Sequence, residues 1–272
     1  MGHLDYEDII ISILTHSKYE FDKIKISEGR KLIGLNTSGH QTSVFDKKIE
    51  DTIIGRIRKL IDPALIISEE AGIIGNQSSK ISVLLDPLDG STNAGRGLPI
   101  FSTSIAIAAG HYYQDIVAAG VINLITGETI TASINEGCKY QKKIVKPSPK
   151  IKLNESVVCI NLVSKHASKQ DSNILGKLIT NIRYPRCFGT AALESAYVAI
   201  GHVDGYVAPF RYLRTYDCLP SIFMIQEAGG FTHMFDQILA DIDLTRNSYL
   251  GFISAGSAGL LNNLKNLFIG EV

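Results

Sequence analysis

The 272-residue chain lacks an excess of charge of either sign, because its 27 Lys and Arg residues balance 27 Asp and Glu residues. Proteins that bind nucleic acid usually carry a basic excess or a basic stripe, so the composition argues against a nucleic-acid partner. Residues 139–150 (KYQKKIVKPSPK) form a basic stretch, but it is short. We expect it to be a solvent-exposed hairpin and linker.

Long apolar runs are also missing, and none of the runs present is long enough to cross a bilayer. The acidic first ten residues do not follow the pattern of a signal peptide, so we expect a cytoplasmic protein without a membrane partner. Cysteine is scarce: Cys138, Cys159, Cys187 and Cys218 are widely spaced, and none forms a C-x-x-C pair. This spacing predicts reduced, mostly buried thiols and no zinc site.

Apolar residues make up 45% of the chain, which is enough for one large domain or two moderate ones. In the first half, the apolar periodicity of residues 49–61 predicts a helix. Short apolar runs predict one strand that ends at Glu69 and Glu70 and a second strand within residues 81–90. Residues 101–134, rich in Ile, Val and Thr, predict antiparallel hairpins.

The polar, proline-bearing segment 146–150 is the expected boundary between a domain of residues 1–150 and a domain of residues 151–272. Strand and helix patterns alternate beyond it, which favours an α/β layer arrangement. The expected strands are 156–163, 203–210 and 251–256. The expected helices are 172–182, 189–201 and 217–230, the last with Pro220 in its first turn.

The segment DPLDGSTN (86–93) places two carboxylates, Asp86 and Asp89, at the end of an apolar strand. Taken alone, an Asp-Pro-x-Asp-Gly sequence is a common turn composition. A metal site explains it equally well, because Mg²⁺ prefers hard oxygen ligands and the Leu88 carbonyl lies between the two acids. The Glu69–Glu70 pair ends a neighbouring strand and offers further carboxylates to the same place.

The residues after Asp89 also allow two interpretations. Gly90 followed by Ser91 and Thr92 offers backbone N–H groups and a hydroxyl to a phosphate. The hydroxyls of Ser91 and Thr92 are equally suited to cap a helix, which needs no function. Similarly, Asp217 on its own has the composition of a helix cap.

Five motifs together resemble the inositol monophosphatase and fructose-1,6-bisphosphatase superfamily of metal-dependent, lithium-sensitive sugar phosphatases. They stand in family order over residues 39–230, so the resemblance covers most of the chain. The motifs are GHQTSVFD (39–46), Glu69-Glu70, DPLDGSTN (86–93), GTAA (189–192) and TYDCLPSIFMIQEAGG (215–230), the last with Tyr216 where Trp is usual.

The resemblance implies a layered αβαβα sandwich with an antiparallel N-terminal sheet, which binds metal and phosphate, and a mixed C-terminal sheet, which recognises the sugar. The implied metal ligands are Glu69, Asp86, Asp89, Asp217 and the Leu88 carbonyl. The implied catalytic residues, which orient the nucleophilic water or hold a weaker metal, are Ser91, Asp46 and Glu70. The implied substrate-binding residues are Gly90, Ser91, Thr92, Gly189, Thr190 and Ala191.

The sequence departs from the inositol-specific branch at Phe210, where that branch has a polyol-binding Glu. Cations lie near this position and in other variable stretches of the second half: Lys165, Arg183, Arg186, Arg211 and Arg214. We expect Arg186 and Arg211 in particular to contact a second phosphate. This pattern is similar to archaeal-type members that accept both inositol monophosphate and fructose 1,6-bisphosphate.

The expected activity is therefore hydrolysis of a sugar or polyol phosphate by a water activated by two or three Mg²⁺ ions, with Mn²⁺ as a substitute and Li⁺ or Ca²⁺ as inhibitors. The resemblance also implies a homodimer. Two other interpretations stay open. One is a phosphatase of the same fold that cleaves 3′-phosphoadenosine 5′-phosphate, and the other is a non-catalytic phosphate-binding relative.

Overall fold

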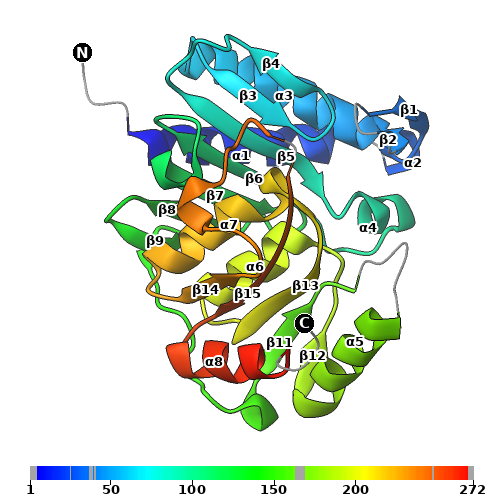
Figure 1. Ribbon diagram of the computed structural model, residues 1–272. Helices are drawn as coiled ribbons and strands as arrows, with labels where there is room; N and C mark the ends of the chain where they lie inside the picture. Colours follow the sequence, from blue (N-terminus) through cyan, green and yellow to red (C-terminus); the bar gives the residue numbers. More distant parts are fainter. Residues whose placement is uncertain are drawn as a thin grey trace.

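The structure is a computed structural model that describes residues 5–24, 26–36, 39, 41–162, 169–246 and 248–268. Its described elements form five layers, which follow one another from helix to sheet to helix to sheet to helix (Figure 1). The layered αβαβα arrangement implied by the resemblance is therefore confirmed.

The first sheet has eight strands in the order β10-β9-β8-β7-β6-β5-β3-β4. Neighbouring strands run antiparallel except for the parallel pair β3 and β5. The strands are β3 (Leu65–Ser68), β4 (Gly72–Gly75), β5 (Ser82–Asp89), β6 (Ser102–Ala108), β7 (Ile116–Asn123), β8 (Thr129–Ser133), β9 (Gly137–Tyr140) and β10 (Lys143–Ile144).

The second sheet has five strands in the order β12-β11-β13-β15-β14 and is mixed. Strand β11 is parallel to both of its neighbours, whereas β15 is antiparallel to β13 and β14. The strands are β11 (Val157–Ile160), β12 (Tyr184–Arg186), β13 (Gly205–Arg214), β14 (Phe231–Met234) and β15 (Tyr249–Ala255).

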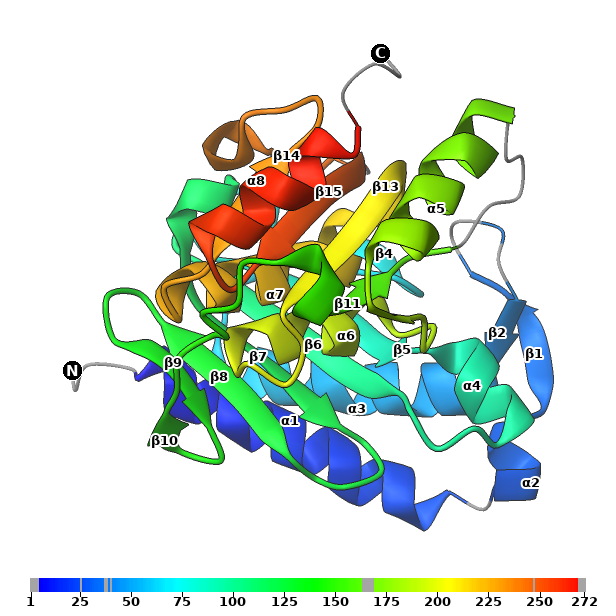
Figure 2. The same ribbon diagram turned by 90° about the horizontal axis from the view of Figure 1, so that it is seen from below.

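Helices α1 (Tyr6–Lys23) and α3 (Val44–Leu60) cover the outer face of the first sheet, and α5 (Lys169–Asn181) and α8 (Ala258–Asn266) cover that of the second (Figure 2). Helices α6 (Ala191–Ala199) and α7 (Thr215–Glu227) lie between the sheets and contact both. Most of their residues are buried, as expected for helices that are apolar on all sides. One hydrophobic core joins α6 and α7 to the inner faces of both sheets.

The remaining elements are short. A small hairpin pairs β1 (Leu32–Leu35) with β2 (Gln41–Ser43) and stands beside α4 (Ser91–Arg96). The other short helices are α2 (Ile26–Gly29), η1 (Tyr113–Asp115), η2 (Leu153–Glu155) and η3 (Leu239–Asp241). The predicted boundary segment 146–150 has no regular structure and connects the first sheet to the second. The division into two domains remains a proposal.

The expected helices and central strands are present, but several ends differ. Helix α7 begins at Thr215, two residues earlier than predicted, so Pro220 lies inside the helix and not in its first turn. Strand β13 continues to Arg214, beyond the predicted end at 210. Three of the expected thiols, Cys138, Cys159 and Cys218, are buried, whereas Cys187 is exposed, and all four are free. Among the described residues, no helix is long and apolar enough to span a membrane.

Candidate active site

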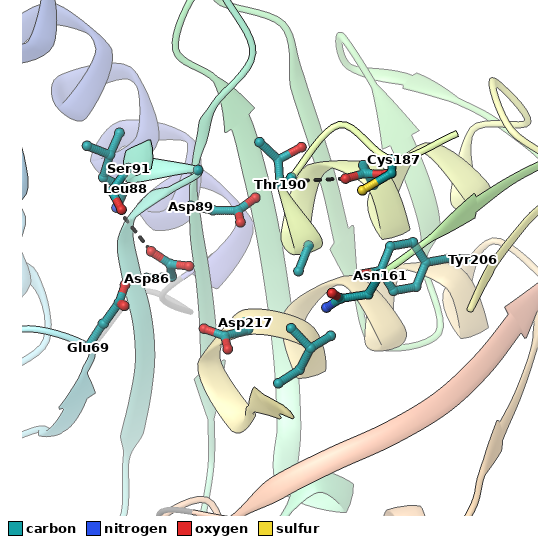
Figure 3. Close-up of a pocket in the computed structure, with 15 residues that line it drawn as sticks. Glu69, Asp86, Leu88, Asp89, Ser91, Asn161, Cys187, Thr190, Tyr206 and Asp217 are labelled. Atoms are coloured by element: carbon teal, nitrogen blue, oxygen red, sulfur yellow. Dashed lines mark hydrogen bonds between the residues drawn. The ribbon is translucent and has the colours of Figure 1, made fainter. Parts of the chain in front are cut away.

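Four carboxyl groups from separate parts of the chain line one cavity of about 180 Å³ between the two sheets. Figure 3 shows Glu69, Asp86, Asp89 and Asp217 on one side of this cavity, with Asn161, Cys187 and Tyr206 on the other. The four predicted acidic metal ligands therefore come together, although almost 150 residues of sequence separate Glu69 from Asp217.

Three of these acids lie on or directly after strands of the first sheet, and the fourth lies on a helix. Parallel strands β3 and β5 pair Ser68 with Leu85, so Glu69, directly after β3, lies beside Asp86. The pairing of β5 with β6 is irregular between Asp86 and Asp89, which lets both side chains reach the cavity from one strand. Helix α7 supplies Asp217 from its first turn.

Backbone and hydroxyl donors fix the three aspartates. Asp86 Oδ1 accepts a hydrogen bond from the Leu88 N–H at 3.1 Å. Asp89 Oδ2 accepts from Ser102 Oγ at 3.0 Å and from the Leu193 N–H at 3.1 Å. Asp217 Oδ2 accepts from the Arg214 N–H at 2.7 Å, so Asp217 also serves the start of its helix. Asp217 is therefore not the N-cap that its composition suggested: Arg214 is the N-cap, and Asp217, at the third position of the helix, accepts from the N-cap backbone and also lines the cavity.

Ionisation of these four carboxyl groups is unfavourable, because burial raises the pKa of each of them. Burial, followed by the charge of Asp217, raises the pKa of Glu69 well above its usual value, and burial followed by the charge of Glu69 does the same to Asp86. Burial also raises the pKa of Asp89 to about 7 and that of Asp217 to about 6. Clustered carboxyl groups of this kind are stabilised by a divalent cation.

The donor set fits a hard cation such as Mg²⁺, because it consists of carboxylate oxygens with the Leu88 backbone beside them. As the side chains stand, however, no group of three or more His, Cys, Asp or Glu residues in the described part of the chain is arranged to hold a metal ion. Glu69, directly after β3, lies beside Asp86 of β5, and burial followed by the charge of Glu69 raises the pKa of Asp86.

The predicted phosphate turn borders the same cavity. Gly90 has φ of 89°, and a Cβ on it would lie 2.6 Å from Thr190 Cγ2, so no other residue fits here without strain. Gly90 is the residue that caps α4, and it does so without a side-chain hydrogen bond. Ser91 and Thr92 lie inside the helix, which rules out the alternative that their hydroxyls cap it. Ser91 lines the cavity, whereas Thr92 lines an adjoining pocket.

This adjoining pocket of about 370 Å³ lies between α4 and the small hairpin and shares Ser91 with the cavity. Asp46 lines it and accepts a hydrogen bond from the Ser43 N–H at 2.7 Å. Glu70, half-buried, accepts from Thr42 Oγ1 and from Asn36 Nδ2 at 3.3 Å. Burial raises the pKa of both acids. Asp46 thus lies in the adjoining pocket that Ser91 shares with the cavity, whereas Glu70 is not among the described residues that line either space.

Gly189, Thr190 and Ala191 line the cavity from the second half of the chain. Arg186 and Arg211 do not line it: Arg186 Nη1 donates to the neighbouring Pro185 carbonyl, and exposed Arg211 lies 3.6 Å from Asp236. Arg214 is buried and donates to the hydroxyls of Tyr216 and Tyr249. Lys165 lies outside the described residues.

The sequence did not point to several residues that line the cavity, namely Asn161, Cys187, Glu194, Tyr206 and Leu213. It also missed Glu50, whose buried Oε1 accepts from Ser68 Oγ at 2.5 Å and from the Ala71 N–H at 2.8 Å. Glu50 thereby holds the turn that carries Glu69 and Glu70. A detectable signal was its place on the apolar face of α3, where an acid next to Ile49 and Ile53 is unusual.

Comparison with known proteins agrees with this geometry. The sequence model of the inositol monophosphatase family matches residues 10–264. The chain therefore belongs to the inositol monophosphatase family and is a phosphatase; members of this family are, in general, metal-dependent.

Three relatives illustrate the range of the family. The chain is 30% identical over 243 residues to the fructose-1,6-bisphosphatase of Pyrococcus furiosus. This match covers 88% of each of the two chains. It is 33% identical over 204 residues to the Nus factor SuhB of Pasteurella multocida, and this match covers 74% of each of the two chains. The crystal structure of the extragenic suppressor protein SuhB from Bartonella henselae superimposes with a TM-score of 0.83 at 25% identity, over 97% of this chain and 98% of that one.

Proposed function

We propose that the chain is a Mg²⁺-dependent phosphatase that hydrolyses a phosphate monoester of a sugar or polyol, with inositol monophosphate and fructose 1,6-bisphosphate as the candidate substrates. The observation that carries this proposal is the convergence of Glu69, Asp86, Asp89 and Asp217 on one cavity beside the Gly90–Ser91 turn. Relatives named for these two activities support the choice of substrates.

In this proposal the four acids and the Leu88 carbonyl hold the cations. When bound, Mg²⁺ makes water a stronger nucleophile and neutralises charge on the phosphoryl and leaving oxygens. The backbone N–H groups at Gly90 and Ser91 bind the phosphate oxygens. The Ser91 hydroxyl, together with Asp46 and Glu70, orients the attacking water, and water displaces the leaving group with inversion at phosphorus.

The wall opposite the acids binds the sugar. It combines apolar surface from Leu213 and Tyr206 with polar groups from Asn161 and the Gly189–Ala191 segment. Among the described residues, no Lys or Arg lines this wall. A second phosphate therefore finds no cation in the described part of the cavity, and this favours a monophosphate over a bisphosphate, contrary to the role expected for Arg186 and Arg211.

The test is phosphate release by the purified chain, with Mg²⁺ and with EDTA, from inositol 1-phosphate, fructose 1,6-bisphosphate, glucose 1-phosphate, NADP and 3′-phosphoadenosine 5′-phosphate. We expect Mg²⁺-dependent release from inositol 1-phosphate and from fructose 1,6-bisphosphate that is faster from the monophosphate. Faster release from the adenosine bisphosphate would replace the proposal with a nucleotide phosphatase. No release from any substrate would favour a non-catalytic relative.

Two further expectations accompany this proposal. Mn²⁺ should substitute for Mg²⁺, and Li⁺ and Ca²⁺ should inhibit, because Ca²⁺ prefers longer bonds and more ligands than an octahedral Mg²⁺ site provides. We also propose a homodimer in the cytoplasm. Sedimentation velocity of the purified chain tests the dimer, and cell fractionation tests the location.

A further inference from the structure

Asn93, the last residue of the DPLDGSTN motif, has no role in the chemistry above, yet it is buried beside the cavity. It lies in α4, directly behind the phosphate turn, with a relative exposure of 7%. Its amide Nδ2 donates to the Phe188 carbonyl at 2.7 Å and to the Ile100 carbonyl at 3.0 Å. Both partners are acceptors, so the amide nitrogen and not the oxygen must face them, and both of its hydrogens are used.

The bond to Phe188 connects two distant parts of the chain. Phe188 lies 95 positions after Asn93, in the segment 187–190 between β12 and α6. This segment has no regular secondary structure, and it lines the cavity with Cys187, Gly189 and Thr190. Asn93 therefore ties the helix that follows the phosphate turn to the segment that faces the sugar.

The approach between the two parts is close. A Cβ on Gly189 would lie 3.6 Å from Asn93 Nδ2, and the φ of 79° at Gly189 is one that residues with a side chain rarely adopt. From the other side, the Thr190 N–H donates to Glu194 Oε1 at 3.0 Å, which Figure 3 shows as a dashed line at Thr190. The segment 187–190 is thus held by its own helix at one end and by Asn93 of α4 beside it.

We propose that Asn93 is a positioning residue that sets the distance between the phosphate turn and the Gly189–Thr190 backbone, and thereby selects substrates whose hydroxyl groups fit this gap. The ligand class is a sugar or polyol phosphate with a hydroxyl on a carbon near the ester, and the inference rests on the function proposed above. A displacement of about 1 Å in such a segment is enough to lower a rate roughly 100-fold. A phosphate ester without sugar hydroxyls does not use the segment.

The experiment compares kcat and KM for inositol 1-phosphate with those for p-nitrophenyl phosphate, whose phosphate binds at the same turn but whose aryl group has no hydroxyl to place. Asn93→Ala removes both donated hydrogen bonds. Asn93→Ser is a milder variant, because serine retains one hydrogen-bond donor and should disturb the surrounding structure less. The matched control is Asn263→Ala, because Asn263 Nδ2 donates to the Ile151 carbonyl at 2.9 Å, a bond of the same type on α8, away from the cavity.

We expect Asn93→Ala to lower the ratio of kcat/KM for inositol 1-phosphate to that for p-nitrophenyl phosphate at least ten-fold, mainly through a higher KM for the inositol ester. Asn93→Ser should lower the ratio less, and Asn263→Ala should leave it within two-fold of the original chain. An unchanged ratio in both Asn93 variants, or an equal loss on both substrates, would overturn the proposal, since a purely structural role lowers both. Failure of the proposed function is distinct, because the original chain would then hydrolyse neither ester.

Discussion

At the scale of single residues, Asp89 and Asp217 hold their protons more tightly in the folded protein than in the unfolded chain. Their pKa values rise from 3.8 to about 7 and about 6, mainly because both carboxyls are desolvated in the cavity. Between about pH 4 and pH 7 the folded state therefore binds more protons than the unfolded state. The free energy of unfolding of the metal-free protein should accordingly fall as the pH rises through this window.

The prediction is measured by urea unfolding in EDTA from pH 4.5 to pH 8, with a slope of up to about 1.4 kcal/mol per pH unit for each group within its own window. Asp217→Asn should reduce the slope and stabilise the metal-free protein. Adding Mg²⁺ should stabilise the original chain more at pH 8 than at pH 5, because the cation binds the ionised carboxylates. A metal-free stability that stays level or increases between pH 5 and pH 7 would contradict this account.

Ser91 offers a second prediction at this scale, because this exposed residue lines both the cavity and the adjoining pocket. Ser91→Thr retains the hydroxyl and should retain activity. Ser91→Ala should lower kcat roughly 10²–10⁴-fold, the range for a lost acid–base partner. Thr92→Ala, one position along the same helix, is the control and should have a smaller effect. Trapping a phosphoseryl intermediate at Ser91 would show that the hydroxyl attacks phosphorus and does not orient water.

At the scale of elements, the turn between β3 and β4 depends on a buried acid from α3. Glu50→Ala removes the acceptor for Ser68 Oγ and for the Ala71 N–H, so we expect a loss of about 1–3 kcal/mol in the free energy of unfolding. We also expect the variant to need a higher Mg²⁺ concentration for half-maximal activity. Glu50→Gln keeps one acceptor oxygen and should lose less.

The control for Glu50 is Asp51→Ala on the same helix, because Asp51 is exposed and pairs with Lys47 across one helical turn. Surface pairs of this kind contribute little, typically under about 1 kcal/mol. Chemical unfolding and Mg²⁺ titrations of the three variants measure both quantities. Equal losses in Glu50→Ala and Asp51→Ala would show that Glu50 does not hold the turn.

The sequence predicted the central elements because their environments leave simple patterns. Strands β5 and β6 are buried on both faces, and they appear in the sequence as apolar runs. Edge strands β4, β12 and β14 have mixed exposure and only three or four residues, so neither alternation nor a run marks them. Helix α7 was placed two residues late because its start depends on the hydrogen bond from the Arg214 N–H to Asp217, which composition alone does not show.

For the site, the residues in contiguous motifs could be predicted from the sequence, whereas those that reach the cavity through packing could not. The acids and glycines of the site belong to contiguous motifs, so the sequence predicts that residues such as Asp86 and Gly90 lie at one site, and both line the cavity. Residues such as Asn161 and Glu194 reach the cavity only through the packing of α6 and β11 against the first half, and nothing in their local sequence marks them. Arg186 and Arg211 were placed at the site from nearness in sequence, but their side chains lie outside the cavity lining.

At the scale of the whole molecule, the two sheets share one core through α6 and α7. Residues from both halves, such as Leu84 and Phe252, belong to the same buried cluster, so separating the halves would expose a large apolar surface. We therefore predict a single cooperative unfolding transition, with midpoints that coincide for far-ultraviolet circular dichroism and tyrosine fluorescence in urea. Two separated transitions would show that the halves on either side of residues 146–150 are independently stable domains.

In the proposed function, Glu69, Asp86, Asp89 and Asp217, which come from both halves of the molecule, together hold divalent cations beside the Gly90–Ser91 turn. The most direct test is an anomalous difference map from crystals of the protein grown with Mn²⁺. We expect the strongest peak inside the cavity, with oxygens of Asp86 and of at least two of the other three acids at about 2.1 Å, as a small octahedral cation requires. A cavity without a peak, in crystals that bind Mn²⁺ elsewhere, would contradict it.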